Sequence, residues 1–388
     1  MRIGIDYTSA AHQGAGIGRL TRNIVEALAE IDDENEYTLL IQGRDLPYAS
    51  QPPGNDGRLR NAASGITGSN FREVRTRVSE RWWNRIWHRL RLPIAVEWLV
   101  GPVQVFHSPD FVLPPVQKLT RTIVTVHDLS FMRLPHCFEP ALLRYLRVNV
   151  PHAVHRADWV LADSQSTRQD VIDLLHAPPE KVSVLYPGVE PRFRPIADKI
   201  ELERVRQQYG LPARFILSVG TLQPRKNHAT LVDAFSRLAV SDVELVIVGQ
   251  RGWLYADLLS QVRGKALKRV HFAGFVQDAD LPAIYNLADV VALPSLYEGF
   301  GLPALEAMAC GIPVVTADNS SLPEVVGDAG LLVQAMDTQA LTVAMERLLS
   351  EAALREALIA RGLARAAGFT WHKAAQDLLA TYVKVGQA

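Results

Sequence analysis

The stretch RFILSVGTLQPRKNHATLVDAFSRLA, residues 214–239, contains the pattern that decides the fold. An apolar run at 214–219 ends in a turn with glycine and proline, and a helical pattern follows at 228–239. Short, continuous apolar runs are typical of strands that are buried on both faces. A strand of this kind followed by a helix predicts one repeating unit of a parallel sheet. Two cations, Arg225 and Lys226, stand in the turn that joins them.

The same alternation extends along most of the chain in both directions. Apolar runs predict strands at 2–6, 37–42, 103–107, 121–126, 158–162 and 181–185, and again at 214–219, 243–248, 270–273, 289–293 and 313–316. Helical patterns occupy 19–31, 139–155, 228–239, 280–287, 301–310 and 371–384. Two sets of strands predict two helix-covered parallel sheets, an α/β fold. Residues 47–70 are rich in proline and glycine, and we expect a mobile loop there.

Length and composition are consistent with two domains and exclude several classes of protein. The 388 residues are about twice the length of a typical domain. Lysine plus arginine and aspartate plus glutamate both number 41, so no overall charge favours a nucleic acid as partner. The two cysteines and the histidines match no metal-binding spacing, and we expect no metal and no cofactor. No signal peptide or membrane-spanning run is visible, which predicts a cytoplasmic protein that is at most peripheral to a membrane.

Two motifs in the first half follow predicted strands, where ligands of parallel sheets bind. The glycine loop from His12 to Arg19 precedes a helix and is suited to a phosphate, although a plain flexible turn is the alternative. Its glycines fail the GxGxxG spacing, which disfavours a dinucleotide-dependent oxidoreductase. The pair His127 and Asp128 ends the strand at 121–126, and a helix cap or strand-end hydrogen bond is the alternative to a ligand role.

Two further motifs lie in the second half. Arg225 and Lys226 open a helix, where cations suit a diphosphate, and a surface pair is the alternative. The stretch from Glu298 to Glu306 runs through a Gly-Phe-Gly turn into a helix whose first amides suit hydroxyl or phosphate oxygens. Glu306 lies among small apolar residues, where a carboxylate is costly unless it binds something. The spacing of the two glutamates alone also allows a paired-carboxylate hydrolase.

One acidic pair has a simpler explanation than a metal site. Asp278 and Asp280 form an Asp-x-Asp pattern, which is typical of some metal sites. A predicted helix with a proline in its first turn follows at once, so we expect Asp280 to cap that helix.

Together these motifs resemble family 4 of the retaining glycosyltransferases, and in particular bacterial mannosyltransferases of polysaccharide assembly. Glu298 and Glu306 match the E-x7-E signature of that family without a gap, and the resemblance covers nearly the whole chain. It implies the GT-B fold, in which two Rossmann-like domains face each other across a cleft. It also implies an acceptor-binding domain at 1–190, a nucleotide-sugar domain at 191–370 and a C-terminal helix at 371–388 that crosses back to the first domain.

The resemblance implies roles for the matching residues. Arg225 and Lys226 would bind the donor diphosphate and stabilise the leaving group, Glu298 would contact the sugar ring, and His127 would touch the transferred sugar; these four are the expected catalytic residues. Glu306 would hold the ribose hydroxyls. The other expected donor contacts are Gly16, Gly18 and Gly220 near the phosphates, the backbone of Phe300, Gly301 and Leu302, and Gly274, Phe275 and Val276 against the base.

The implied activity is transfer of a hexose, with retention of configuration, from a nucleoside diphosphate sugar to a glycan or a lipid-linked acceptor. GDP-mannose is the expected donor, because the segment from His127 to Phe131 is similar to that of the mannosyltransferases. A UDP-sugar-dependent transferase, a sugar-nucleotide epimerase and a non-catalytic nucleotide-sugar binding protein are the alternatives.

Residues 71–92 carry seven arginines and only two glutamates. Apolar residues recur at steps of four from Val74 to Leu90, with Trp83 and Trp87 beside them. This pattern predicts a basic amphipathic helix that docks on an anionic membrane, at the inner face of the cell membrane. The alternative is a surface helix packed on the first domain.

Overall fold

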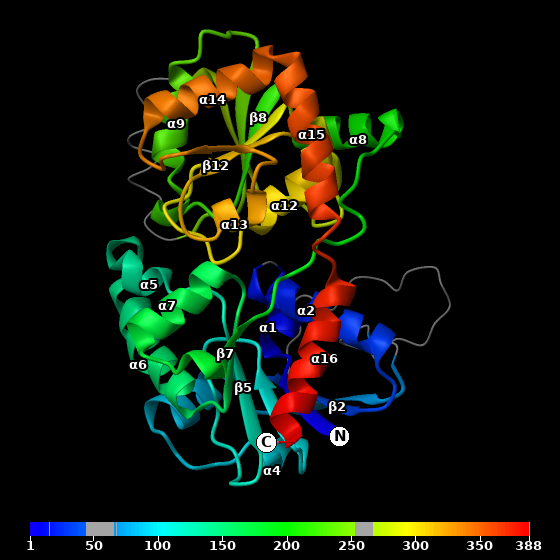
Figure 1. Ribbon diagram of the computed structural model, residues 1–388, viewed down its shortest axis with the longest axis vertical. Coiled ribbons are helices and arrows are strands. Elements are labelled where there is room, and N and C mark those ends of the chain that lie inside the picture. Colours follow the sequence, from blue (N-terminus) through cyan, green and yellow to red (C-terminus); the bar gives the residue numbers. More distant parts are fainter. Residues whose placement is uncertain (15, 44–65, 67, 253–266, 388) are drawn as a thin grey trace. The chain divides into compact units, whose positions relative to one another are not determined.

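The computed structural model describes residues 1–14, 16–43, 66, 68–252 and 267–387. The chain divides into two compact units, each of which contains one sheet (Figure 1). Unit 1 comprises Met1–Leu129, Arg144–Gly188 and Thr370–Ala388, and unit 2 comprises Ser130–Leu143 and Val189–Phe369. The α/β architecture predicted from the alternation of strands and helices is confirmed.

The sheet of unit 1 is parallel, with the strand order β3-β2-β1-β4-β5-β6-β7. Its strands are β1 (Arg2–Asp6), β2 (Glu36–Gln42), β3 (Phe71–Thr76), β4 (Val105–Ser108), β5 (Arg121–Val126), β6 (Trp159–Ala162) and β7 (Val182–Val184). Ile3 of β1 lies in register with Tyr37 on one side and Val105 on the other. The direction of winding reverses between β1 and β4, and ligands of parallel sheets bind beyond the carboxyl ends at such a reversal.

The C-terminal helix is part of the core of unit 1. Helix α16 (Trp371–Gln387) packs beside α2 (Ile17–Ile31), as Figure 1 shows. Leu378 and Tyr382 are fully buried in the same cluster as the central strands. The Tyr382 hydroxyl also lies 2.8 Å from Nδ1 of His107 on β4. The hydrophobic core of unit 1 is therefore completed by residues from the far end of the chain.

The sheet of unit 2 is also parallel, with the order β10-β9-β8-β11-β12-β13. Its strands are β8 (Phe215–Val219), β9 (Glu244–Val248), β10 (Val270–Gly274), β11 (Val290–Leu293), β12 (Val314–Ala317) and β13 (Leu331–Val333). Winding reverses between β8 and β11. The turn with Arg225 and Lys226 leaves β8, and the turn with Glu298 leaves β11, so both begin at the reversal.

Helices bury one apolar face each against the second sheet. Helix α9 (His228–Ser236) packs against α14 (Thr338–Ser350). Leu231 and Phe235 of α9 are completely buried, in a cluster that includes Met345 of α14. The helical pattern at 228–239 therefore corresponds to a helix whose apolar positions form the core of unit 2.

The structure describes a further set of helices. They are α1 (Thr8–His12), α3 (Glu80–Trp83), the π-helix η1 (Asn84–Arg89), α4 (Glu97–Val100), α5 (Ser130–Arg133), η2 (Pro135–Cys137), α6 (Pro140–Arg156), α7 (Gln165–Leu175), η3 (Pro179–Lys181), α8 (Lys199–Tyr209), η4 (Pro224–Lys226), η5 (Leu267–Arg269), α11 (Leu281–Leu287), α12 (Leu302–Ala309), α13 (Leu322–Val326) and α15 (Ala352–Ala366). Within the described part of the chain, no helix combines the length and apolar character needed to cross a bilayer.

The predicted strands are all present, with ends displaced by at most two residues. Two strands were missed. Strand β13 has only three residues, and β3 lies in the segment that was expected to be helical. The loop expected at 47–70 falls almost entirely outside the described residues.

The prediction of one amphipathic helix over residues 71–92 is wrong in its first part. Residues Phe71–Thr76 form edge strand β3, which pairs with β2 along its whole length. Helical structure begins only at Glu80. The i+4 spacing of apolar residues that suggested a helix is also compatible with a strand, because positions four apart share a face in both structures.

Candidate functional site

The turns after β8 and β11 are joined by backbone and side-chain hydrogen bonds. The amide of Leu296 donates to the carbonyl of Arg225 at 2.8 Å. Asn227 donates from its side chain to the carbonyls of Pro294, at 2.9 Å, and Ala335, at 2.7 Å. Asn227 itself has a φ of 56°, a left-handed conformation that asparagine tolerates better than most residues. These contacts fix the short helix η4, and with it Arg225 and Lys226, against the turn after β11.

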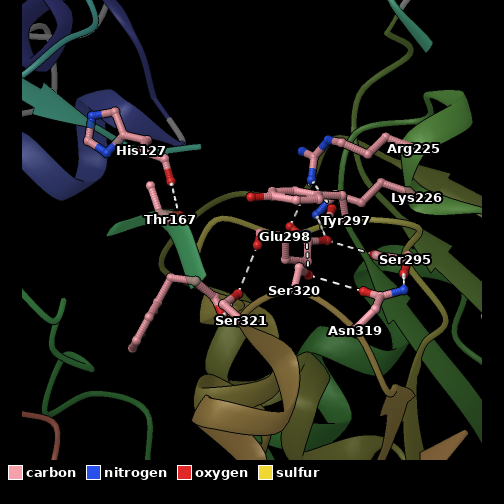
Figure 2. A network of polar contacts seen from close by, with 11 residues as sticks. His127, Thr167, Arg225, Lys226, Ser295, Tyr297, Glu298, Asn319, Ser320 and Ser321 are labelled. Carbon is pink, nitrogen blue, oxygen red and sulfur yellow. Dashed lines mark hydrogen bonds and ion pairs between the residues drawn. The ribbon is translucent and has the colours of Figure 1, made fainter. Parts of the chain in front are cut away.

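Glu298 binds both cations (Figure 2). Its Oε2 lies 3.0 Å from Nη1 of Arg225, and its Oε1 lies 2.6 Å from Nζ of Lys226. Ser295 donates a further hydrogen bond to Oε1 at 2.6 Å. The three charged side chains are between 10% and 14% exposed, so the cluster is largely removed from water. Two cations and one carboxylate leave a net positive charge at the reversal point of the sheet.

The cations determine the protonation state of Glu298. Burial alone would raise the pKa of this carboxyl group, but Lys226 and Arg225, with hydrogen bonds from Lys226 and Ser295, lower it to about 2. Glu298 is therefore ionised at neutral pH and is not a general acid there. In the hydrolase alternative an ionised Glu298 would serve as the nucleophile or the base, and Glu306 would have to be the general acid.

Serines after β12 hold the backbone of Glu298. Its amide donates to Oγ of Ser320 at 2.9 Å, and Oγ of Ser321 donates to its carbonyl at 2.9 Å (Figure 2). Ser321 also lies 2.7 Å from the carbonyl of Phe300. These serines and Ser295 were not among the expected site residues. Ser320 and Ser321 follow a predicted strand at 313–316. Their position after the carboxyl end of that strand is the sequence feature that could have identified them as candidate site residues.

Glu306 lies in a different environment from Glu298. It sits on α12, is 2% exposed, and accepts a hydrogen bond at 2.8 Å from the hydroxyl of Tyr285 on α11. The expectation that a buried carboxylate here needs a partner is thus met in part by a tyrosine that sequence reasoning did not identify. Gly301, which precedes α12, has a φ of 110°, a region that L side chains rarely adopt. Leu302 begins the helix, and the ring of Phe300 is buried edge-on against Phe369.

Glycines end three neighbouring strands of unit 2. Gly220 follows β8, and a Cβ there would lie 3.0 Å from Cε of Lys226, so glycine leaves space for that side chain. Gly249 follows β9, and a Cβ there would lie 2.0 Å from the carbonyl oxygen of Gly220. Gly274 ends β10 with a φ of 71° and open space around it. Beside it Phe275 is 56% exposed and Val276 is buried, so the expected base contact has an accessible aromatic ring.

In unit 1 the two expected glycines occupy different surroundings. Gly16 caps α2 with φ 60° and ψ −130° and is exposed, and no atom lies within 4 Å of the point that a Cβ would occupy there. Gly18 is buried, and a Cβ there would lie 2.5 Å from the carbonyl oxygen of Ser9. Gly18 is thus required for packing, whereas Gly16 leaves its backbone open to a ligand. Arg22 fixes this loop through the carbonyls of Ala10, Gln13 and Gly14.

His127 is a buried imidazolium. Its Nδ1 lies 2.8 Å from Oδ2 of Asp163, and its Nε2 lies 3.0 Å from the carbonyl oxygen of Pro109. Both partners accept hydrogen bonds, so both ring nitrogens donate. Burial alone would lower the pKa of His127, but the Asp163 carboxylate, aided by Asp110 and Pro109, raises it to about 9. In this state the ring has no lone pair with which to accept a proton.

The prediction that Asp280 caps a helix is correct for its position and wrong for its side-chain contacts. Asp280 occupies the position before α11, but its carboxylate makes no capping bond. It binds Arg204 at 2.6 Å and Tyr209 at 2.7 Å, both on α8. Asp278 pairs with Arg192 at 2.6 Å. Neither aspartate belongs to a metal-binding group, and among the residues for which positions are given no cluster of metal-binding side chains occurs.

Comparisons with known proteins identify the family of the chain. The model of Glycosyltransferase Family 4 matches residues 14–193, and that of Glycosyl transferases group 1 matches residues 201–365. O-antigen chain mannosyltransferase B of Escherichia coli is 34% identical over 377 residues, which are 95% of each chain. This chain belongs to glycosyltransferase family 4. The family predicted from the E-x7-E stretch and the accompanying motifs is confirmed.

Other family 4 relatives and the solved structures show the breadth of the likeness. D-inositol 3-phosphate glycosyltransferase of Salinispora arenicola is 34% identical over 408 residues, covering 97% of this chain and 90% of its own. Sucrose-phosphate synthase of Thermosynechococcus elongatus has a TM-score of 0.75 at 22% identity, with 99% of this chain and 98% of that chain covered. The latter likeness shows that the two units form the GT-B fold of these transferases.

We predict that His127 stays protonated at pH 8. Because its folded pKa is raised, its contribution to stability is complete below its ordinary pKa of 6.5 and is lost as pH rises through about 9. NMR of the histidine ring nitrogens checks this, with His127→Gln to assign the signal. His228 is the internal control, because burial and Lys226 lower its pKa to about 3 and keep it neutral. A neutral His127 ring at pH 7 would contradict the assignment.

Proposed function

We propose that this transferase moves a mannosyl group from GDP-mannose to a glycan or a lipid-linked acceptor, with retention of configuration. The observation that carries the proposal is the pair of largely shielded cations, Arg225 and Lys226, at the reversal point of the second sheet. The choice of mannose is supported by the 34% identity to the E. coli mannosyltransferase over 95% of the chain. In this proposal unit 2 binds the donor and unit 1 binds the acceptor.

Each proposed role follows from charge and position. As the glycosidic bond breaks, negative charge grows on the diphosphate, and fixed cations stabilise it without a metal ion. Arg225 and Lys226 are those cations, and the Gly301 and Leu302 amides at the start of α12 add donors beside them. Glu306 binds the ribose hydroxyls and Glu298 the sugar ring. Gly16 leaves its backbone open to phosphate oxygens, and Gly220 leaves the space that the Lys226 side chain occupies near them. Gly18 supports the first of these loops, and Gly274, Phe275 and Val276 face the base.

His127 has an electrostatic role in this proposal. Its two ring nitrogens already donate to Asp163 and Pro109, so the ring carries a fixed positive charge at the end of β5. Such a charge stabilises and orients oxygen atoms of a bound sugar but does not remove a proton from the acceptor. The proton of the acceptor hydroxyl is then expected to leave with the departing diphosphate, as a front-face mechanism requires.

Loss of either cation should abolish most of the transfer. We predict that Arg225→Ala and Lys226→Ala each reduce kcat/KM for GDP-mannose by about a hundredfold or more, the size of effect seen when one preorganised donor is removed. Arg237→Ala is the control, because Arg237 is half exposed and pairs with its helix neighbour Asp233.

A thermal-shift screen with GDP, UDP, ADP, dTDP and NAD identifies the base of the donor nucleotide. Unchanged turnover in both variants, or stabilisation by NAD alone, overturns the proposal.

A second proposal concerns the basic segment at 80–92, which we infer docks on an anionic membrane. Trp83 and Trp87 stack together and are buried, so the helical part is anchored on unit 1. Its outer face carries exposed apolar side chains, with Trp82 56% and Leu90 64% exposed. The arginines beside them are exposed as well: Arg81, Arg85, Arg89 and Arg91. Exposed aromatic and apolar groups among arginines are typical of surfaces that bind anionic lipids.

Sedimentation with vesicles tests the membrane proposal. The wild type should pellet with phosphatidylglycerol vesicles, and not with neutral phosphatidylcholine vesicles, in a manner that salt reverses. Changing Arg81, Arg85 and Arg89 together to glutamate should abolish pelleting. The matched control changes Arg237, Arg347 and Arg361, which are exposed arginines of unit 2. Equal pelleting of both triple variants, or none by the wild type, contradicts the proposal.

A further inference from the structure

A second group of carboxylates lines a pocket in unit 1. The pocket lies at the carboxyl ends of β1, β2 and β4, where the order of the first sheet reverses. Asp6 is the last residue of β1, Gln42 is the last residue of β2, and Asp110 follows β4. Glu80 and Trp87 border the pocket from α3 and η1. The geometry therefore repeats that of the unit 2 site, but with acidic residues in place of cations.

The polar groups of the pocket are held in place by the protein. Oδ1 of Asp6 accepts a hydrogen bond from the amide of Thr8 at 3.0 Å, and Oδ2 accepts one from Nε2 of Gln42 at 3.1 Å. Oδ1 of Asp110 accepts from the amide of Phe111 at 2.7 Å. These bonds orient the carboxylates but use only part of their accepting capacity.

One buried polar atom of the pocket has no partner among the described residues. Gln42 is 5% exposed, and its Oε1 accepts no hydrogen bond from any residue that the structure describes. Buried amide oxygens are nearly always paired, because an unmade bond costs about 1–3 kcal/mol. A hydroxyl group that enters the pocket would supply the missing donor. This atom points to a ligand independently of the carboxylates.

The charge of the lining selects against anions. Asp6, Glu80 and Asp110 are acidic, and the lining residues that are described include no lysine or arginine. His88 also lines the pocket, but burial and the neighbouring Arg156 lower its pKa to about 4, which leaves it neutral. Burial raises the pKa of Asp6 to about 6 and also raises that of Asp110, while the His127 imidazolium acts on Asp110 in the opposite direction. Phosphate or carboxylate ligands would be repelled.

We infer that this pocket binds the terminal residue of a neutral sugar acceptor, whose hydroxyls donate to Asp6, Asp110 and Oε1 of Gln42. The buried indole ring of Trp87, which stacks on Trp83 and donates a hydrogen bond to the carbonyl of Ile94 at 2.8 Å, adds an apolar border to the pocket. The inference rests on the proposed function and deepens it by naming the acceptor class. It separates this chain from its D-inositol 3-phosphate relatives, whose named substrate is an anion.

Matched ligands test this inference without a donor. Methyl α-D-mannopyranoside and myo-inositol are neutral ligands. D-myo-inositol 3-phosphate differs from myo-inositol only by its phosphate group. Binding is followed by NMR through the indole N–H signal of Trp87, assigned with Trp87→Phe. The mannoside should shift this signal in a saturable way, and inositol phosphate should not. Equal binding of the phosphate, or no shift with any neutral sugar, overturns the inference.

Variants show whether the named groups form the site. Asp110→Asn and Asp6→Asn should each weaken mannoside binding at least fivefold and raise the acceptor KM, with the GDP-induced thermal shift unchanged. Glu36→Gln is the control, because Glu36 is an exposed carboxylate at the opposite end of β2. If a variant is less stable, the other remains informative, because Asp6 lies in a strand and Asp110 in a loop. Unaltered mannoside binding in both variants contradicts the inference.

The controls distinguish failure of this inference from failure of the proposed function. If GDP stabilises the protein but no neutral sugar binds, the pocket is not the acceptor site and the transferase proposal stands. If no nucleotide binds but the mannoside shifts Trp87, the donor proposal fails and the sugar site stands.

Discussion

The carboxylate of Glu298 holds Arg225 and Lys226 in place, and the candidate site of the second unit depends on that contact. The two cations leave β8, and the carboxylate leaves β11, so their ion pairs join the turns on both sides of the reversal. Removing one partner of such a buried cluster leaves an uncompensated charge and typically costs about 3–5 kcal/mol. The carboxylate neutralises only one of the two cations. The cluster is therefore stable without a ligand and still attracts an anion.

Parallel sheets impose this geometry in both units. The carboxyl ends of neighbouring strands meet at one edge, and a reversal of winding leaves space between the turns that follow. In unit 2 that space is bordered by cations, and in unit 1 by Asp6, Gln42 and Asp110. The same constraint thus produces two sites of opposite charge. In our proposals a diphosphate binds at the first and the hydroxyls of a neutral sugar bind at the second.

The sequence predicted most of the fold because buried parallel strands are continuous apolar runs that are easily recognised. Strand β3 was missed since an edge strand with Arg72, Glu73 and Arg75 carries charges that a central strand excludes. Arg225, Lys226, Glu298 and Glu306 stand in local motifs, and the structure brings the first three together. Their neutral partners, such as Ser320 and Tyr285, are distant in sequence.

The capping role expected for Asp280 illustrates the same limit. Its place before a helix is a local feature, whereas its bonds to Arg204 and Tyr209 depend on how α8 packs against α11. Likewise, His127 was recognised from its position after a strand, but its charge state depends on Asp163, which follows a different strand. Position in a motif can be read from sequence, but protonation depends on the packing of other elements.

The most direct test of the central claim is the affinity for GDP of the Glu298→Gln variant, measured by calorimetry. If the diphosphate competes with the Glu298 carboxylate for Arg225 and Lys226, removal of that charge should tighten GDP binding several-fold, because both cations are then available to the ligand. Transfer should fall at the same time, since the sugar loses its contact. A loss of GDP affinity as large as that in Arg225→Ala would contradict the account.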